Sequence, residues 1–317
     1  MHKIKVNRKL KEAEGITSFE LVSPAGDELP AFTAGAHIDI HIRPGLVRQY
    51  SLCNPPGETH RYVIAVLNEP TSRGGSKAMH DSIEEGDLIT IGLPRNLFEL
   101  DGGAEHYLLF AGGIGITPML AMAHHLYAQG KSFALHYCGR TAARLAFVQQ
   151  LRHSPFANAV HFHLDDGPTS QRLDLPQLLG TPSPSQQLYI CGPTGFMDFV
   201  LNEARGRGWH EDALHREYFS APVTTTAQDP AFEVELRQSQ RVIAIPAART
   251  VLEMLLEAGV EVASSCEQGV CGSCLIPVLE GQPDHRDQFL TAQERQANNC
   301  FTPCCSRSFS PRLVLDL

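Results

Sequence analysis

The first hundred residues alternate apolar and polar positions in short runs. These runs occur at residues 4–6, 18–22, 37–41, 62–66 and 88–91. Turn signals separate them, such as Ser23-Pro24-Ala25-Gly26 and Asn54-Pro55-Pro56-Gly57. A period of two is typical of half-buried strands, and many short strands with intervening turns favour an antiparallel barrel. We therefore expect a β-barrel domain over residues 1–102.

The pattern changes after residue 102. Residues 107–111 form a continuous apolar run bounded by glycines, as a buried parallel strand does. The following segments alternate in type: a helix at 118–129, a strand at 133–138, a helix at 143–151, and strands at 160–164 and 187–191. Alternation of strands and helices predicts a doubly wound α/β domain over residues 103–222.

The last segment is separated from the rest by small, polar and proline-bounded residues. These predict a linker at 223–231. A third domain is then expected over 232–317. It contains strands at 232–237 and 242–245, a helix at 251–258, a cysteine-rich loop, and strands at 275–279 and 313–317.

Composition narrows the class of protein. A chain of 317 residues suits two or three domains. No apolar run approaches the roughly 20 residues that span a bilayer, and the N-terminus shows no signal-peptide pattern. We therefore expect a soluble, cytoplasmic protein without a membrane partner. The formal net charge of −9 makes a nucleic-acid partner unlikely, because such proteins carry a basic surplus.

Six of the nine cysteines lie between Cys266 and Cys305. Cys266, Cys271 and Cys274 have the spacing C-x4-C-x2-C, with further cysteines far downstream, which is the plant-type [2Fe–2S] arrangement. Four thiolates must converge on two irons, and glycines at 269 and 272 allow the loop backbone to curl close to the sulfides. The motif predicts an iron–sulfur cluster.

Two alternatives compete with this interpretation. A structural zinc site usually pairs its cysteines as two C-x2-C knuckles, which the x4 spacing fits poorly. The second alternative is a group of unrelated buried thiols. The fourth ligand is open at this point, because Cys300, Cys304 and Cys305 all compete for the role.

Two segments of the barrel indicate a flavin. Arg48-Gln49-Tyr50-Ser51 resembles the R-x-Y-S motif of the ferredoxin reductase superfamily. The guanidinium of Arg48 would neutralise a phosphate, Tyr50 would lie against the isoalloxazine face, and the Ser51 hydroxyl would bond toward N5. A second segment, Arg73-Gly74-Gly75-Ser76, also indicates a flavin. Its glycines at the start of a helix would form a nest of N–H groups that binds a phosphate. Taken singly, the motifs also fit an ordinary strand and a flexible loop.

Two turns of the α/β segment indicate a nicotinamide nucleotide. Gly113-Ile114-Gly115-Ile116-Thr117-Pro118 follows a buried strand and opens a helix. Pro118 replaces the last glycine of the dehydrogenase fingerprint, which disfavours a typical Rossmann dehydrogenase; G-x-G-x-x-P is the usual form in reductases of the ferredoxin reductase type. Cys191-Gly192-Pro193 ends another strand. In those reductases this turn borders the nicotinamide, whereas a lone thiol in such a turn is otherwise a packing residue.

With these motifs in this order, the whole chain resembles the phthalate dioxygenase reductase family. The resemblance implies FMN as the flavin, NADH as the electron donor and a C-terminal β-grasp ferredoxin domain. It also implies Cys304 as the fourth iron ligand, Cys191 near the site of hydride transfer, and Phe219 as the aromatic that stacks near the flavin. Core packing is an equal alternative for Phe219.

The expected function is electron transfer. A hydride delivers two electrons together and a [2Fe–2S] cluster accepts one, so a flavin must act between them. The resemblance implies a reductase component of a Rieske-type oxygenase system of aromatic catabolism. We expect a transient complex with that oxygenase and a monomeric reductase. The alternatives are a reductase for another acceptor, and a redox sensor or zinc protein that has kept the fold without turnover.

Overall fold

The computed structural model describes residues 1–70, 73–221 and 225–317, and the chain divides into two compact units, Met1–Glu217 and Tyr218–Leu317. Residues 223 and 224 of the expected linker lie outside the described residues. The expected boundaries of three domains stay a prediction. No helix in the described ranges combines the length and the apolarity that crossing a membrane requires.

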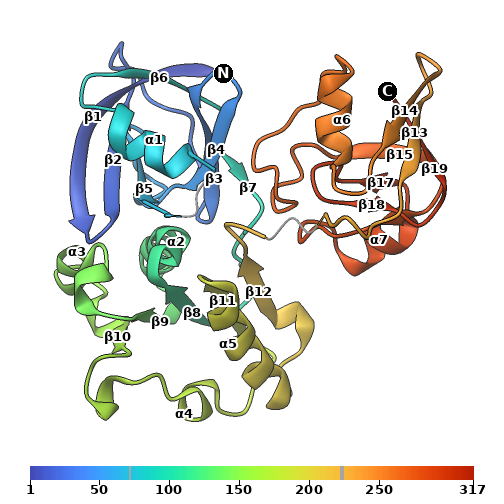
Figure 1. Cartoon of the computed structure of the whole chain (residues 1–317). Coiled ribbons are helices and arrows are strands. Elements are labelled where there is room, and N and C mark those ends of the chain that lie inside the picture. The colour runs from blue at the N-terminus through green and yellow to red at the C-terminus, as the bar shows by residue number, and fades with distance from the viewer. Residues whose placement is uncertain (71–72, 222–224) are drawn as a thin grey trace. The chain divides into compact units, whose positions relative to one another are not determined.

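The first unit begins with an antiparallel barrel (Figure 1). Its sheet has the order β4-β3-β6-β1-β2-β5, and an isolated bridge between Leu52 and Ile64 joins the β4 end to β5. The side chains facing inward, such as Phe19, Ile38 and Ile64, are fully buried. The barrel elements are β1 His2–Ala13, β2 Ile16–Val22, β3 Ala36–Arg43, β4 Leu46–Ser51, β5 Tyr62–Leu67, α1 Gly75–Ser82, β6 Leu88–Ile91 and β7 Arg95–Asn96.

A parallel sheet of order β10-β9-β8-β11-β12 completes this unit. Its order reverses between β8 and β11, and ligands of doubly wound sheets bind at the carboxyl ends of the strands at such a point. The strands are β8 His106–Gly112, β9 Ser132–Gly139, β10 Val160–Leu164, β11 Gln186–Cys191 and β12 Leu214–Glu217. The helices are α2 Ile116–Ala128, α3 Val148–Arg152, α4 Leu175–Leu179 and α5 Thr194–Gly206.

The barrel and the parallel sheet share one hydrophobic core. Helix α2 is buried along most of its length, and its side chains belong to the same cluster as Ile16, Ala65 and Phe98 of the barrel segment. This common core explains why residues 1–217 form one compact unit.

The expected fold classes of both parts are confirmed, and one expected helix is wrong. Residues 143–151 do not form a continuous helix: a 3₁₀ turn, Ala142–Arg144, precedes the short helix α3. Phe147 separates them with a left-handed φ of 58°, and its side chain is buried in the shared core. Burial of Phe147 therefore overrides the helical pattern.

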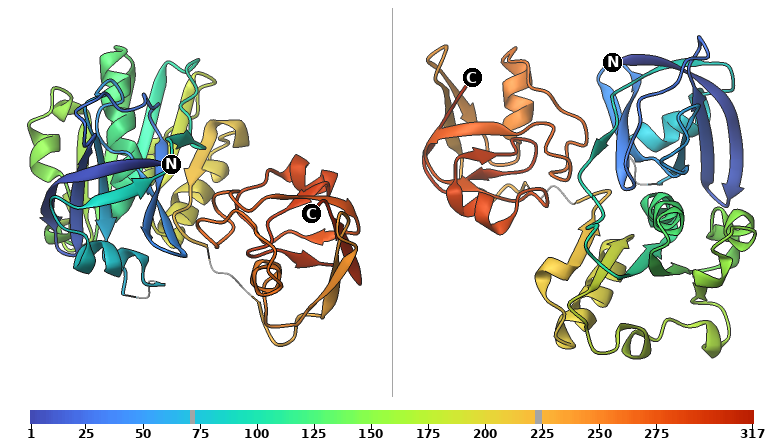
Figure 2. Two further views of the ribbon diagram at one scale, coloured as in Figure 1. Left: turned by 90° about the horizontal axis from the view of Figure 1, so that it is seen from above. Right: turned by 180° about the vertical axis from the view of Figure 1, so that it is seen from behind.

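The second unit is a mixed sheet of order β14-β13-β19-β15-β17, with helix α6 packed on it (Figure 2). Strands β13 and β19 are parallel and their other neighbours antiparallel, as in the expected β-grasp domain. A small ladder joins β16 and β18. The elements are β13 Phe232–Leu236, β14 Arg241–Ile245, α6 Val251–Glu257, β15 Ile276–Glu280, β16 Pro283–Asp284, α7 Ala292–Ala297, β17 Cys300–Phe301, β18 Arg307–Ser308 and β19 Arg312–Leu315.

Two arginines attach the start of this unit to its interior. Arg286 donates to both carboxylate oxygens of Asp229, at 3.0 and 3.1 Å. Arg307, 1% exposed, donates to the carbonyl oxygens of Arg249, Pro230 and Pro246 at 2.6–3.1 Å. The segment that carries Asp229 and Pro230 is therefore bound to the ferredoxin fold, although the sequence predicts it as part of a linker.

Candidate functional site

The predicted phosphate-binding residues of the barrel come together at the start of α1. Gly74, the residue before the helix, has a φ of 88°, which favours glycine. The side chain of Arg48, from β4, crosses Gly75 so closely that a Cβ there would lie 2.8 Å from Arg48 Nε. Arg48 Nη2 donates to the Arg73 carbonyl oxygen at 3.4 Å. A guanidinium at a helix N-terminus, where N–H groups point outward, suits a phosphate.

The Ser76 side chain makes a hydrogen bond to the backbone near the same turn. Its hydroxyl oxygen accepts a hydrogen bond from the Glu69 N–H at 3.2 Å, which holds the approach to α1. Contact of Ser76 and of Arg73 with a phosphate stays a prediction.

Tyr50 and Ser51 end strand β4, beside the parallel sheet. Tyr50 packs against the barrel core, and burial raises the pKa of its phenol, so the hydroxyl stays neutral. Ser51 is 5% exposed and lies 3.5 Å from Glu217 Oε2, to which its hydroxyl donates. The barrel strand that carries the predicted flavin motif thus meets the last strand of the α/β sheet.

Glu217 was not predicted from the sequence. It pairs with Cys191 across the parallel strands β11 and β12. Burial raises the pKa of Glu217 to about 8, and the hydrogen bond from Ser51 opposes this shift only in part. Burial, with the nearby Glu217, also raises the pKa of the Cys191 thiol. The Ser51 hydroxyl and the Glu217 carboxyl therefore form a neutral hydrogen-bonded pair, and the Cys191 thiol on the adjoining strand is also neutral. The signal that was missed is strand β12, which places Glu217 at a carboxyl end of the sheet.

The two predicted nicotinamide turns pack against each other through glycines. A Cβ on Gly115 would overlap the Cys191 carbonyl group and lie 2.8 Å from the Gly192 nitrogen. A Cβ on Gly192 would lie 2.9 Å from Gly112 Cα. The absence of side chains at these positions therefore brings the ends of β8 and β11 together at the point where the sheet order reverses.

The remaining residues of these turns divide into two groups. Thr117 is 2% exposed and donates to the Ile114 carbonyl oxygen at 3.1 Å, and Pro118 is buried in α2. Gly113 has a φ of 55° with open space where a side chain would project, and Pro193 is exposed before α5. Gly113 and Pro193 are thus accessible to a ligand, whereas Thr117 and Pro118 build the turn. Their contact with a nucleotide stays a prediction.

Phe219 belongs to the second unit, and 40% of it is exposed. Its predicted stacking near a flavin stays a prediction.

Two cavities of the first unit lie away from these residues. One, of about 150 Å³, is lined by residues that include Cys53, Arg61 and Phe147; the other, of about 410 Å³, includes Leu29 and Tyr62. None of the predicted site residues lines either cavity. Arg61 is already paired with Glu20 and Glu58, so it offers no unmatched charge to a nucleotide. We assign neither cavity to the cofactors.

The cysteines of the C-terminal unit approach one another in two groups. Cys266 hydrogen-bonds to Cys271, and Cys304 hydrogen-bonds to both Cys274 and Cys305. All five are buried. In the described part of the chain, no group of three His, Cys, Asp or Glu side chains is arranged to hold a single metal ion. A cluster in which each of two irons takes two protein ligands needs two groups of thiols, and both are present.

Backbone N–H groups of the loop are directed at two of these sulfurs. The hydrogen bond between Cys266 and Cys271 lowers the pKa of the Cys271 thiol and raises the pKa of the Cys266 thiol. The Cys271 sulfur further accepts a bond from the Ser273 N–H at 3.4 Å, and the Cys266 sulfur accepts one from the Gln268 N–H at 3.4 Å. Backbone N–H groups directed at sulfur stabilise the deprotonated form that binds iron.

The three competing cysteines differ in their surroundings. Cys304 contacts Cys274, one of the three motif cysteines. The Cys305 sulfur lies 3.3 Å from Thr302 Oγ1 and adjoins Gly269, whereas Cys300 is half-buried in β17. Cys305 belongs to the same buried cluster as Cys274 and Cys304, so the choice of Cys304 as the fourth ligand stays a prediction.

Comparisons with known proteins give a consistent result. Residues 234–308 match the family described as a 2Fe-2S iron-sulfur cluster binding domain. The chain is 50% identical to a vanillate O-demethylase oxidoreductase of Pseudomonas sp. (strain HR199 / DSM 7063) over 96% of each chain.

Two solved structures are similar over nearly the whole chain. One is phthalate dioxygenase reductase, described as a modular structure for electron transfer from pyridine nucleotides to [2Fe–2S]. It is 41% identical, with a TM-score of 0.77, over 100% of this chain and 98% of the other. The second is an intact type IV self-sufficient cytochrome P450 monooxygenase. It is 36% identical, with a TM-score of 0.86, over 99% of this chain and 41% of the other.

Proposed function

The chain belongs to the phthalate dioxygenase reductase family, and on this premise we propose that it is the NADH-dependent reductase component of a Rieske-type oxygenase system. Electrons pass from NADH through FMN to a [2Fe–2S] cluster and on to the oxygenase. The observation that carries the proposal is the pairing of Cys266 with Cys271 and of Cys274 with Cys304, in a chain that also contains both nucleotide motifs.

The flavin supplies the change from a two-electron donor to a one-electron acceptor. Arg48 and the N–H groups at Gly74 and Gly75 would hold its phosphate, as their convergence at the start of α1 supports. Tyr50 and Ser51, which follow on the same strand, would contact the ring.

The residues around the reacting atoms act by position. Ser51 and Cys191 are buried and Glu217 is half-buried; all three are neutral, so they present a hydroxyl, a thiol and a carboxyl without adding charge. Hydride transfer between two bound rings needs alignment rather than an acid or base. Gly113 and Pro193 would border the nicotinamide, because they are the accessible residues of the two turns.

The partner is an aromatic ring dioxygenase or an O-demethylase. The vanillate O-demethylase oxidoreductase, half of whose residues are identical, supports the O-demethylase. The reductase would dock briefly through a small interface, near Glu267 and Gln268 of the cluster loop, since electron transfer requires rapid release. We further propose a cytoplasmic monomer; light scattering should give a mass near 34.8 kDa.

Rapid mixing with NADH tests the electron path. Flavin absorbance should decrease before the cluster is reduced, because the cluster cannot accept a hydride. The variant Cys274→Ser should lose the cluster and keep NADH-dependent flavin reduction. Simultaneous loss of both activities, or reduction of the cluster before the flavin, would contradict the proposal.

A second acceptor has a specific observation in its favour. A region 36% identical to this chain forms part of a self-sufficient P450 monooxygenase, so a haem protein is the competing partner. NADH-dependent reduction of purified acceptors distinguishes the two. Faster turnover with a separate P450 than with Rieske-type oxygenases would favour the second acceptor.

A further inference from the structure

A buried carboxylate lies against the proposed cluster loop and has no part in the function proposed above. Asp287, in the segment after β16, is 1% exposed. Carboxylates are rarely buried unless they are paired or hydrogen-bonded, because the charge must leave water. The contacts of Asp287 therefore call for an explanation.

The segment that carries Asp287 touches the cluster loop at both of its glycines. The Gln288 N–H donates to the Gly269 carbonyl oxygen at 2.8 Å. Gly269 has a φ of 71°, and a Cβ there would lie 3.2 Å from Asp287 Cβ. A Cβ on Gly272 would overlap the ring of Phe289. The segment 287–289 and the loop 266–274 therefore pack together without intervening side chains at the glycines.

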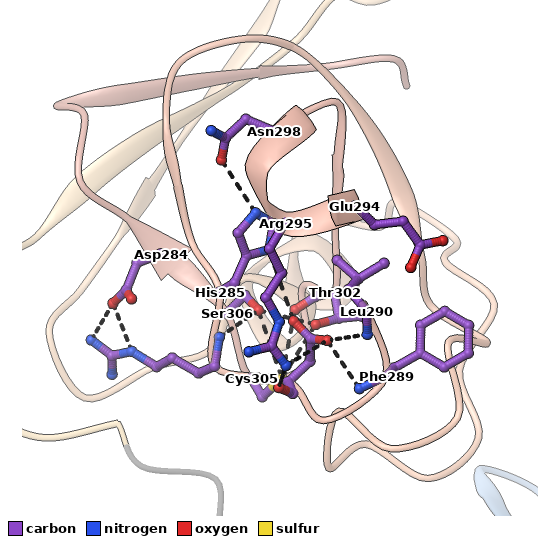
Figure 3. Close-up of polar contacts among 12 residues, drawn as sticks. Asp284, His285, Phe289, Leu290, Glu294, Arg295, Asn298, Thr302, Cys305 and Ser306 are labelled. Atoms are coloured by element: carbon purple, nitrogen blue, oxygen red, sulfur yellow. Dashed lines mark hydrogen bonds and ion pairs between the residues drawn. The ribbon is translucent and has the colours of Figure 1, made fainter. Parts of the chain in front are cut away.

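Asp287 gives this segment its shape. Its Oδ2 accepts hydrogen bonds from the N–H groups of Phe289, at 3.0 Å, and Leu290, at 2.6 Å. Arg295 of α7 donates to the Asp287 carbonyl oxygen, and its guanidinium lies 3.8 Å from Oδ2. In Figure 3 the dashed hydrogen bonds of Phe289 and Leu290 and the side chain of Arg295 converge in one place.

The negative charge is only partly compensated. Asp287 Oδ1 is buried with no hydrogen-bond partner among the residues that the structure describes. The nearest ring nitrogen, His285 Nδ1, lies 3.8 Å away, and the other ring nitrogen of His285 lies 3.3 Å from Asn298 Oδ1. Cys305, which adjoins the same glycine, hydrogen-bonds to the Cys304 thiol and to neighbouring hydroxyls and supplies no positive charge. Arg295 is thus the main positive charge beside Asp287.

A buried charge acts more strongly on its neighbours than an exposed one, because little water screens it. A negative charge beside an iron–sulfur cluster disfavours the added electron, and net charge is one of the factors that set the reduction potential of such clusters. We propose that Asp287 is a positioning residue that lowers the reduction potential of the cluster, while Arg295 opposes it. This inference rests on the proposed function, since it requires the cluster.

Redox titration of the cofactor-loaded protein, followed by EPR of the reduced cluster, tests the inference. Asp287→Asn keeps an acceptor oxygen for Phe289 and Leu290 and removes the charge, so the cluster potential should rise. Arg295→Met should lower it. The flavin potential and the rate of flavin reduction by NADH should stay unchanged in both variants.

A matched control removes a carboxylate that water screens. Glu280, on β15, pairs with Arg237 and has a side chain 66% exposed, so Glu280→Gln should leave the potential unchanged. A purely structural role for Asp287 predicts loss of iron or a lower thermal midpoint without opposite shifts of potential. Iron content and thermal midpoints are therefore measured for every variant.

The outcomes separate the two hypotheses. An unchanged potential in Asp287→Asn with full iron content, or shifts in the same direction in both variants, overturns the inference. If Asp287→Asn loses its iron, Arg295→Met decides alone: a lower potential supports the inference, and an unchanged one overturns it. A wild-type protein that binds no cluster contradicts the proposed function instead.

Discussion

At the scale of single residues, the neutral state of Glu217 has a consequence for pH. The pKa of Glu217 is raised to about 8 by burial, from 4.5 in an unfolded chain. Between these values the unfolded chain releases the proton and the folded chain keeps it. Folding stability therefore decreases as pH rises from about 4.5 to about 8, by roughly 3–5 kcal/mol at 1.36 kcal/mol for each pKa unit.

Glu217→Gln should remove this pH dependence, because the amide cannot ionise. Its thermal midpoint relative to the wild type should rise between pH 5 and pH 9, measured by calorimetry of the flavin-loaded protein. Glu203→Gln, on the surface of α5, serves as the control and should show no such trend. A constant difference between wild type and Glu217→Gln would contradict the buried, neutral carboxyl.

Gly115 makes a second prediction at this scale. A side chain there would overlap the Cys191 carbonyl group, so Gly115→Ala should force the two nicotinamide turns apart. We expect NADH-dependent flavin reduction to slow by roughly tenfold or more, since small displacements of bound reactants are costly. Gly195→Ala is the control, because nothing lies within 4 Å of its position. Equal rates in the two variants would refute the close packing of the turns.

At the scale of elements, the sequence predicts what depends on local pattern. Strand 160–164 has the predicted bounds, and the glycine turns follow strands β8 and β11 as expected. Glu217 was missed because β12 is short and Leu214 is the one apolar residue among its four positions. Helix α7 was missed because it buries no side chain and so has no apolar periodicity. The choice among Cys300, Cys304 and Cys305 depends on chain folding at long range, which spacing alone does not contain.

Helix α6 links local sequence to the cluster. Thr250 and Glu253 form a capping box, and the Leu252 N–H donates to the Pro303 carbonyl oxygen at 2.9 Å, next to Cys304. Thr250→Ala should destabilise the C-terminal unit by about 1 kcal/mol, which lowers the midpoint of a domain of this size by about 4–8 °C. Asp174→Ala, which removes the cap of helix α4 in the first unit, should leave iron release by a chelator unchanged, whereas Thr250→Ala should accelerate it. Equal rates of iron release in the two variants would show that α6 does not help to retain the cluster.

At the scale of the whole molecule, the two units should unfold separately. Arg307 satisfies three carbonyl groups and lies over the ring of Phe232. Arg307→Met leaves those groups without a donor, so it should destabilise the C-terminal unit by about 3 kcal/mol or more. Calorimetry should show a lower midpoint for this unit and an unchanged one for the flavin-binding unit. Arg312→Met, half exposed and paired with Glu233, is the matched control and should cost less than about 1 kcal/mol. A shift of both transitions would mean that the units unfold together.

The attachment of Asp229 and Pro230 to Arg286 and Arg307 also sets the point at which this protein can be recombined. A ferredoxin cassette cut at residue 232, where its first strand begins, would lose Asp229 and the Pro230 carbonyl. Arg286 would then keep only Asp284, and Arg307 only the Arg249 and Pro246 carbonyls, of the partners described here. A cassette that starts at Thr226 carries its own anchor, since the Thr226 N–H already bonds to Asp229. Gene fusions that attach this ferredoxin domain to another reductase should therefore place the junction before Thr226. Natural exchange of domains meets the same constraint.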